Sequence, residues 1–277
     1  MESLILTSSA TLTLGPLALP WSLVLLLLAW LAGNYLHDKT AARAGLPPGP
    51  HAWALLLTLL GAARLGFVLQ FWTEYATAPW SLLNIRDGGW TAGWGLLAGG
   101  GYLLVLWLRG NAWRKPLTLG AGLGLLLWSL GQTVLPGAQP PRPQTLPDWQ
   151  GVALDARTLA LPALAGQPLV INLWASWCPP CRREMPVLLQ ARQAHPELRF
   201  LWVNQGEAVD TVLPFATAQR LPQADTLLDG TGQLGRLLGY GSLPTTLFFN
   251  AQGQLVAVRS GELSAATLAQ HLTLIRP

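Results

Sequence analysis

The chain has 277 residues, of which 51% are hydrophobic and 11% charged, and its formal net charge is +4. A length of this order is typical of about two domains. The charge is too small, and the arginines too scattered, for a nucleic-acid partner, which requires a dense basic face. Residues 1–135 hold ten of the fourteen tryptophans and eleven charged side chains, whereas residues 136–277 hold ten arginines, nine acids and no lysine. The first half is therefore membrane-like in composition and the second is soluble-like.

The first half contains apolar runs long enough to cross a bilayer, which takes about 20 residues. We predict an α-helical membrane bundle of four transmembrane helices, at about 17–35, 52–72, 90–108 and 117–135. Buried core helices of a soluble fold are the alternative, but such helices normally carry a polar face that these segments mostly lack.

The short loops between these runs indicate the orientation in the membrane. The loops after the first and third runs hold five basic residues, whereas the loop after the second run holds only Arg86. The five are Lys39, Arg43, Arg109, Arg114 and Lys115. Because basic loops stay in the cytoplasm, we expect a multi-pass protein of a bacterial inner membrane. Its N-terminus and everything after residue 136 would then lie in the periplasm, and the first run would be a retained span rather than a cleaved signal.

Three stretches of residues 14–100 resemble the prolipoprotein diacylglyceryl transferase family. They are "LGPLALPWSLVLLLLAWLAG", "GAARLGFVLQFW" and "PWSLLNIRDGGWTAGWGLLAGG". That family carries a histidine where this chain has Gly93, and its later Arg/Asn/Gly signature has no counterpart here. The resemblance therefore implies a lipid-facing scaffold, with membrane lipids as partners, and no lipid transfer.

Two arginines of this half are candidate functional residues. Arg64 lies in the middle of the second predicted span, where a charge is costly and usually faces a partner or a cavity. It either ties the bundle together or recognises a lipid, a quinone or a protein partner, and Glu74 or a lipid phosphate would pair with it. Arg86 and Asp87 precede two glycines in a loop that could contact headgroups or the soluble domain.

The segment 136–150, "PGAQPPRPQTLPDWQ", contains five prolines. Such a composition favours an extended spacer of about 3 Å per residue. We expect a linker here and a separate periplasmic domain over 151–277.

The only two cysteines, Cys178 and Cys181, follow the β-rich run "PLVINLWASWC" and open a segment with helical apolar spacing. A cysteine at the start of a helix meets free amide hydrogens and the positive end of the helix dipole, both of which favour the thiolate. This spacing allows a disulfide, with Cys178 as the attacking sulfur and Cys181, one turn further in, as the resolving one.

The motif "WASWCPPC" resembles the thioredoxin fold, and especially the membrane-anchored thiol-disulfide oxidoreductases of the TlpA and cytochrome c maturation type. The stretches "FLWVNQGEAVDTVLPFA" and "SLPTTLFFNAQGQLV" match the same pattern, so the resemblance covers nearly all of 151–277. It implies an α/β thioredoxin-like domain in which Pro244 is a cis-proline beside the disulfide. Trp177, Leu243 and Pro244 would bind the substrate peptide, and Trp174, Pro179, Pro180 and Pro186 would support the active site.

The resemblance also implies an acid that assists proton transfer. Thioredoxin itself has a buried aspartate where this chain has Asn172, which cannot accept a proton. Glu207 is the candidate replacement, and a solvated acid at the start of a helix is the alternative interpretation of that residue.

Three other interpretations of the motifs are disfavoured. A zinc site needs about four ligands, and His195 and His271 do not supply a second pair by spacing. A purely structural disulfide would leave the tryptophan-flanked motif unexplained. The formal G-x-G-x-x-G at 230–235 lacks the acid about 20 residues later that a dinucleotide site needs, since Asn250 stands there, so we expect a turn and a helix start.

These observations predict a thiol-disulfide oxidoreductase that uses its cysteine pair and no cofactor or metal. The resemblance favours a reductase of periplasmic protein disulfides or thiols. The membrane half has no cysteine, so electrons would arrive from an external donor protein. A disulfide oxidase or isomerase, and a membrane-bound peptide-binding or chaperone module without turnover, are the rival functions.

Overall fold

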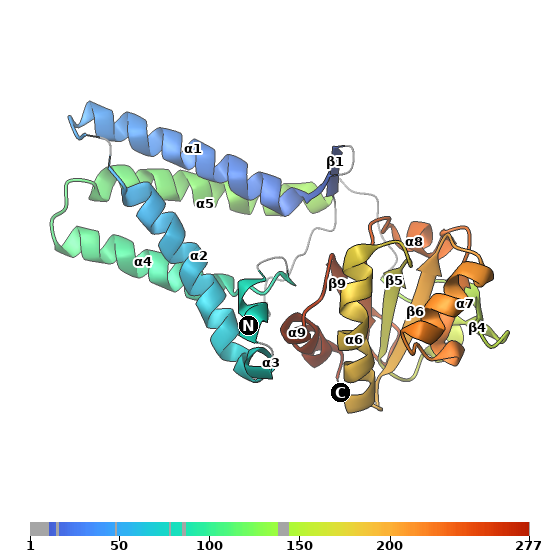
Figure 1. Cartoon of the computed structure of the whole chain (residues 1–277). Helices are drawn as coiled ribbons and strands as arrows, with labels where there is room; N and C mark the ends of the chain where they lie inside the picture. The colour runs from blue at the N-terminus through green and yellow to red at the C-terminus, as the bar shows by residue number, and fades with distance from the viewer. Residues whose placement is uncertain are drawn as a thin grey trace. The chain divides into compact units, whose positions relative to one another are not determined.

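The structure is a computed structural model that describes residues 11–14, 17–47, 49–77, 79–84, 87–137 and 144–276. The chain divides into two compact units (Figure 1). One consists of Met1–Thr73 and Gly89–Pro140, and the other of Glu74–Gly88 and Pro141–Pro277.

The first unit is built from long apolar helices preceded by a short hairpin. Its elements are β1 (Thr11–Leu14), β2 (Leu17–Pro20), α1 (Trp21–Arg43), α2 (His51–Gln70), α4 (Ala92–Leu108) and α5 (Arg114–Gly137). Between α2 and α4 in the chain come α3 (Trp72–Thr77) and η1 (Pro79–Leu83), which belong to the second unit from Glu74 onward. The first helix starts four residues later than predicted. Leu17–Pro20 pairs with β1 instead, and the helix begins directly after Pro20, whose ring is not accommodated in a helix interior.

Helices α1 and α5 pack side by side, as do α2 and α4 (Figure 1). The first pair approaches closely at Gly33 and Gly120, where a Cβ on Gly33 would lie 2.6 Å from the carbonyl oxygen of Gly120. Small residues of this kind let helix backbones approach closely, as they do in membrane bundles.

Four helices thus occupy the predicted apolar runs, but they differ in their suitability to span a bilayer. Among the described residues, His51–Gln70 and Arg114–Val134 are long and apolar enough to do so. Ala92–Leu108 is apolar but has 17 residues, and the C-terminal part of α1 carries Asp38, Lys39 and Arg43. The structure therefore provides two candidate spans, and the four-span bundle stays a prediction.

The second unit contains a seven-stranded sheet in the order β4-β3-β7-β6-β5-β8-β9. Strands β5, β6 and β7 are parallel, and β3 and β8 run antiparallel to their neighbours β7 and β5. The strands are β3 (Gln150–Ala153), β4 (Thr158–Ala160), β5 (Leu169–Trp174), β6 (Arg199–Gln205), β7 (Thr226–Asp229), β8 (Thr245–Phe249) and β9 (Leu255–Ser260). The helices are η3 (Leu161–Leu164), α6 (Pro179–Ala194), α7 (Val209–Ala218), η4 (Gln223–Asp225), α8 (Gln233–Leu238) and α9 (Ala265–Ile275).

Strand β5 lies in the middle of the sheet and is buried on both faces, as its continuous apolar run predicts. Val170 and Trp174 face a core cluster with residues of α6, α7 and α9, whereas Ile171 and Leu173 face a second cluster with residues of α8 and η3. The strand is thus held from both sides, and its C-terminal end is a rigid base for the residues that follow.

The end of the expected linker belongs to the sheet domain. Leu146 N donates to Gly253 O at 2.9 Å, and Thr145 forms a bridge with Gln254. Trp149 is 4% exposed within the core cluster that contains Ile171. Trp149 is buried and Leu146 is partly buried against the same cluster, so this end of the segment is part of the domain. Residues 138–143 lie outside the described residues.

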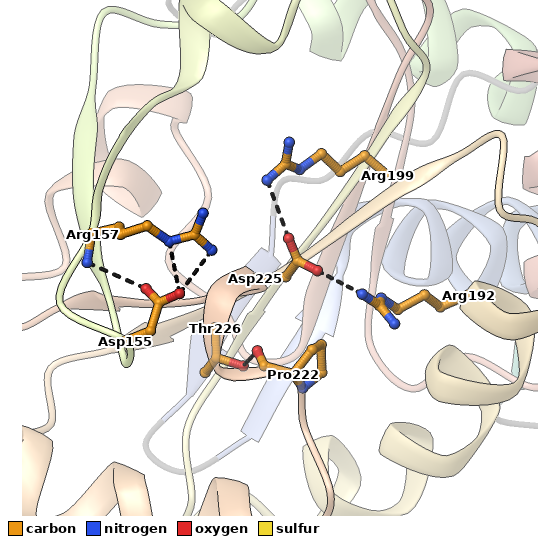
Figure 2. A network of polar contacts seen from close by, with 7 residues as sticks. All are labelled: Asp155, Arg157, Arg192, Arg199, Pro222, Asp225 and Thr226. Atoms are coloured by element: carbon orange, nitrogen blue, oxygen red, sulfur yellow. Dashed lines mark hydrogen bonds and ion pairs between the residues drawn. The ribbon is translucent and has the colours of Figure 1, made fainter.

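A polar cluster anchors the far end of α6. In Figure 2, Asp225 lies between two arginines, and its carboxylate accepts from Arg192 of α6 at 2.8 Å and from Arg199 of β6 at 3.2 Å. The Thr226 hydroxyl donates to Pro222 O at 2.8 Å in the same turn. These contacts fix the C-terminal end of α6 to β6, while its N-terminal end carries the cysteines.

Candidate active site

The cysteine pair lies where β5 gives way to α6, as predicted. Cys178 is the N-cap of α6, and its sulfur accepts from the Cys181 amide at 3.3 Å. Pro179 and Pro180 have no N–H, so Cys181 contributes the first amide of the helix that can donate. The helix N-terminus is therefore directed at the Cys178 sulfur.

The two cysteines form a disulfide with an S–S distance of 2.01 Å and a Cα–Cα distance of 5.3 Å. Cys178 is 3% exposed and Cys181 is fully buried. Trp177, directly before the pair, is 68% exposed. The Trp177 side chain therefore lies at the surface, whereas Cys178 contributes little surface.

The peptide bond between Leu243 and Pro244 is cis, as the resemblance implies. Pro244 is buried at the start of β8, and Leu243 packs against the core cluster that contains both cysteines. The contribution of Trp177, Leu243 and Pro244 to substrate binding stays a prediction.

Glu207 lies in the loop before α7 and holds the loop that leads into the cysteines. Its carboxylate accepts from the Ser176 amide at 2.7 Å, from the Ser176 hydroxyl, and from Asn204 Nδ2 at 2.6 Å. Partial burial would raise the pKa of Glu207, but the hydrogen bonds from Asn204 and Ser176 outweigh it and hold the pKa below its ordinary value. A carboxylate kept ionised in this way is suited to fixing the loop and poorly suited to exchanging a proton near neutral pH.

A second acid, Glu184, was not among the predicted site residues. It lies one turn after Cys181 on the buried face of α6 and is 0% exposed. Its carboxyl accepts from Asn172 Nδ2 at 2.7 Å and from the Leu263 amide at 3.0 Å. Burial raises the pKa of Glu184 to about 8, against the opposing effect of these two hydrogen bonds.

Two charged groups act on Glu184 from neighbouring elements. Glu262, in the loop after β9, raises its pKa further, and Arg259 of β9 lowers it. Glu262 is itself paired with Arg183 at 2.5 Å. Glu184 is therefore a largely protonated carboxyl near neutral pH, one helical turn from the resolving cysteine.

The sequence did contain a signal for Glu184. Cys181, Glu184, Met185 and Leu188 follow the i, i+3, i+4, i+7 spacing of one helix face, and all four are buried. An acid on an otherwise apolar face is unusual, because buried carboxyls are rare without a partner. The position of that acid one turn after a cysteine would have marked it as a candidate.

Asn172 links this acid to the cis-proline strand. Its Nδ2 donates to Glu184 and also to Thr246 Oγ1, at 3.0 Å. Asn172 and Thr246 are direct cross-strand neighbours of β5 and β8, and both are at most 1% exposed. The position that holds the proton-accepting aspartate in thioredoxin thus holds here an amide that contacts a different acid.

The support that Trp174, Pro179, Pro180 and Pro186 give to the pair stays a prediction. Trp174 is fully buried and its ring lies 5.3 Å from that of Phe215. Pro179 is exposed at the start of α6, and Pro186 lies inside this helix.

The membrane-half candidates lie in the other unit or outside the described residues. Arg64 donates to Gly89 O at 2.8 Å, and its guanidinium lies 5.9 Å from the Trp90 ring. Arg86 lies outside the described residues. Gly93 is exposed, with no atom within 4 Å of the place of a Cβ, so a side chain there would point away from the helical unit.

The G-x-G-x-x-G stretch at 230–235 is a turn and a helix start, as predicted. Asp229 accepts from the amides of Gln233 and Leu234, each at 2.8 Å, and thereby caps α8. Over the residues that the structure describes, no group of three or more His, Cys, Asp or Glu side chains could hold a metal ion.

Comparisons with known proteins match the half that carries this site. The family described as "AhpC/TSA family" matches residues 143–258. Thiol-disulfide oxidoreductase ResA of Geobacillus thermodenitrificans (strain NG80-2) is 30% identical over 135 residues, which are 48% of this chain and 77% of that protein. Sporulation thiol-disulfide oxidoreductase A of Bacillus subtilis (strain 168) is 26% identical over 153 residues, 53% of this chain and 90% of that protein.

Among solved structures, that of MTB DsbF in mixed oxidised and reduced forms is 27% identical, with a TM-score of 0.45, and covers 49% of this chain and 100% of that one. The sequence matches to named oxidoreductases agree with the disulfide between Cys178 and Cys181 at the start of α6. The chain therefore belongs, through its C-terminal half, to the AhpC/TSA family of thioredoxin-fold proteins, and it is a thiol-disulfide oxidoreductase of the ResA type.

Proposed function

We propose that this protein is a membrane-anchored, periplasmic reductase that exchanges its Cys178–Cys181 pair with the disulfides of partner proteins. The observation that carries the proposal is the position of Cys178 as the N-cap of α6, where the helix favours a thiolate. The two candidate spans and the basic loops of the first half support anchoring with the cysteine domain outside the cytoplasm.

The exchange has two steps. The Cys178 thiolate attacks one sulfur of the partner disulfide, so that a Cys178–partner bond forms, the partner's own S–S bond breaks and a partner thiolate leaves. Cys181 then loses its proton and attacks the Cys178 sulfur, which forms the internal disulfide and releases the second partner thiolate. The partner gains two electrons and the Cys178–Cys181 pair loses them.

We propose that Glu184 handles the proton of the second step. Cys181 and Glu184 are both fully buried on one face of α6, so water is a poor acceptor for that proton. With a pKa of about 8 in the oxidised form, Glu184 is ionised in a minor fraction of the molecules near neutral pH. This ionised fraction can take the proton that Cys181 loses, and the raised pKa lets the carboxyl keep it. When an external donor protein reduces the disulfide, the same carboxyl can return the proton to Cys181.

Glu207 is proposed to position the loop before Cys178 through Ser176, and Trp177, Leu243 and Pro244 are proposed to bind the substrate chain. The first half is proposed to be a four-span scaffold, similar to the diacylglyceryl transferase family in residues 14–100, that contacts membrane lipids without transferring them. Arg64 belongs to this scaffold through its bond to Gly89.

The test of the function is a trapping experiment in cells with the full chain. Cys181→Ser removes the resolving sulfur, so we expect partner proteins to accumulate as mixed disulfides on Cys178, and Cys178→Ser is the matched control that should trap none. The reductase direction is checked by the redox state of the wild-type pair in cells, which should be largely reduced. A largely oxidised pair would favour the oxidase or isomerase, and activity that survives Cys178→Ser would favour a binding module.

A C-terminal reporter enzyme that is active only in the periplasm tests the location. We expect it to be active when fused after residue 277. An inactive reporter would contradict the proposed orientation.

A further inference from the structure

The side-chain amide of Asn172, next to Glu184, uses its hydrogen-bond donors but not its acceptor. Asn172 Nδ2 donates both to Glu184 Oε1 and to Thr246 Oγ1, at 2.7 and 3.0 Å. Over the described part of the chain, the other end of the same amide, Oδ1, is buried and accepts no hydrogen bond. Asn172 is 1% exposed, so solvent does not satisfy that oxygen.

The observed orientation of the amide suits an ionised Glu184. An ionised carboxylate only accepts hydrogen bonds, and here it receives one from Asn172 and one from the Leu263 amide. A protonated carboxyl has in addition an O–H that must donate. If the proton is on Oε1, that O–H would face the Nδ2 group, which is itself a donor.

A half-turn of the Asn172 amide about the bond to its Cβ removes this conflict. The turn exchanges Nδ2 and Oδ1, so that the carbonyl oxygen then lies between Glu184 and Thr246. That oxygen has two lone pairs, which can accept from the protonated Glu184 and from the Thr246 hydroxyl. Both neighbours thus keep a hydrogen bond in both orientations, and neither strand has to move.

We propose that Asn172 is a positioning residue that stabilises Glu184 in both its ionised and its protonated form by turning its amide over between Glu184 and Thr246. The inference rests on the role proposed above for Glu184, because it explains how that carboxyl can gain and lose a proton while it stays buried. A carboxyl at position 172 could not do this without adding a second titrating group beside the first.

The test uses the full chain in detergent micelles with the disulfide intact, labelled with ¹⁵N-asparagine and ¹³C-glutamate. Between pH 5 and 9, the Asn172 side-chain amide signal should change with the same midpoint as the Glu184 carboxyl carbon. The groups that act on Glu184, Arg259 of β9 and Glu262 after it, stay unaltered, and the oxidised cysteines do not titrate. Asn250, which bonds Gln254 at 3.0 Å on the surface, is the internal control and should not change.

Three variants complete the test. The Asn172 signal is assigned by its loss in Asn172→Asp, or in Asn172→Leu if the former does not fold. In Glu184→Gln the pH-dependent change of the Asn172 signal should vanish. In Asn172→Leu the titration midpoint of Glu184 should rise by about one pH unit, a tenfold change in proton affinity. Removal of the Asn172 donor costs the ionised carboxylate more hydrogen-bond energy than it costs the neutral carboxyl.

A side-chain amide signal of Asn172 that does not change while the Glu184 carboxyl titrates would overturn the inference. This outcome is distinguishable from a failure of the proposed function. If Glu184→Gln exchanged disulfides at the wild-type rate, the role of Glu184 in exchange would be refuted. The turning of the Asn172 amide is decided separately, by the pH dependence of its signal in the oxidised wild type.

Discussion

Glu184 should make the stability of the cysteine domain fall as the pH rises, and Glu184→Gln should remove this dependence. In the folded domain burial raises the pKa of Glu184 to about 8, whereas its ordinary value is 4.5. Between these values the folded state binds a proton that the unfolded chain has lost. The free energy of unfolding therefore decreases as pH rises through this window.

The size of the effect follows from the two pKa values. The gap between 4.5 and about 8 corresponds to about 5 kcal/mol, or about 1.4 kcal/mol per pH unit inside the window. This figure is an upper limit, because an ionised Glu184 can be relieved by local opening or by entry of water. Glutamine stays neutral at every pH, so the variant should gain between about 2 and 4 kcal/mol over the wild type from pH 5 to pH 8.

Hydrogen exchange followed by mass spectrometry measures this difference in the full chain, because peptides that cover β5 report on the cysteine domain alone. The disulfide is kept intact at pH 5, 6, 7 and 8. Asp210→Asn, at an exposed acid in the first turn of α7, is the matched control and should leave the pH dependence as it is in the wild type. A difference between wild type and Glu184→Gln that is the same at pH 5 and pH 8 would refute a raised pKa for Glu184.

Three further outcomes are expected. Glu207→Gln removes one of the acceptors that hold the loop before the cysteines, so it should lower the free energy of unfolding by about 1 kcal/mol. Disulfide exchange should become several-fold slower, and the pH profile of its rate should stay unaltered. Burial lowers the pKa of His271 below the ordinary histidine value of 6.5, so at acid pH the unfolded chain binds more protons than the folded domain. The free energy of unfolding should therefore decrease as the pH falls, and His271→Leu should abolish this decrease in urea titrations between pH 5 and 7. Gly33→Val should destabilise the helical unit in detergent, since a Cβ there meets the Gly120 carbonyl. Gly100→Val, where a Cβ meets no atom within 4 Å, should leave the stability unaltered or raise it slightly, because valine is a better helix former than glycine.

The features that could be predicted from the sequence are those that depend on neighbouring residues in the chain. The burial of β5 follows from its continuous apolar run, and the place of Cys178 at the start of α6 follows from the change of pattern after that run. The cis bond before Pro244 followed from the resemblance of a short motif.

The features that escaped prediction depend on contacts between distant segments. Leu146 and Trp149 looked like part of a proline-rich tether, but they lie against Gly253 and in the core around Ile171. The raised pKa of Glu184 likewise arises from burial under residues of β5 and of the loop at Leu263, 79 positions further along the chain. The spacing within α6 places Glu184 on the buried face of the helix, but it does not identify the residues of other elements that cover the carboxyl.

Glu207 and Glu184 differ in the direction in which their surroundings shift the pKa. The resemblance points to Glu207, which follows a strand of the expected pattern, but three hydrogen bonds from Ser176 and Asn204 hold this carboxylate ionised. Glu184 receives two hydrogen bonds but is fully buried, and burial dominates. Opposite pKa shifts of two carboxyls are a usual way in which a site separates a fixed charge from a group that exchanges protons. On this physical ground we assign the anchoring of the active-site loop to Glu207 and the proton of Cys181 to Glu184.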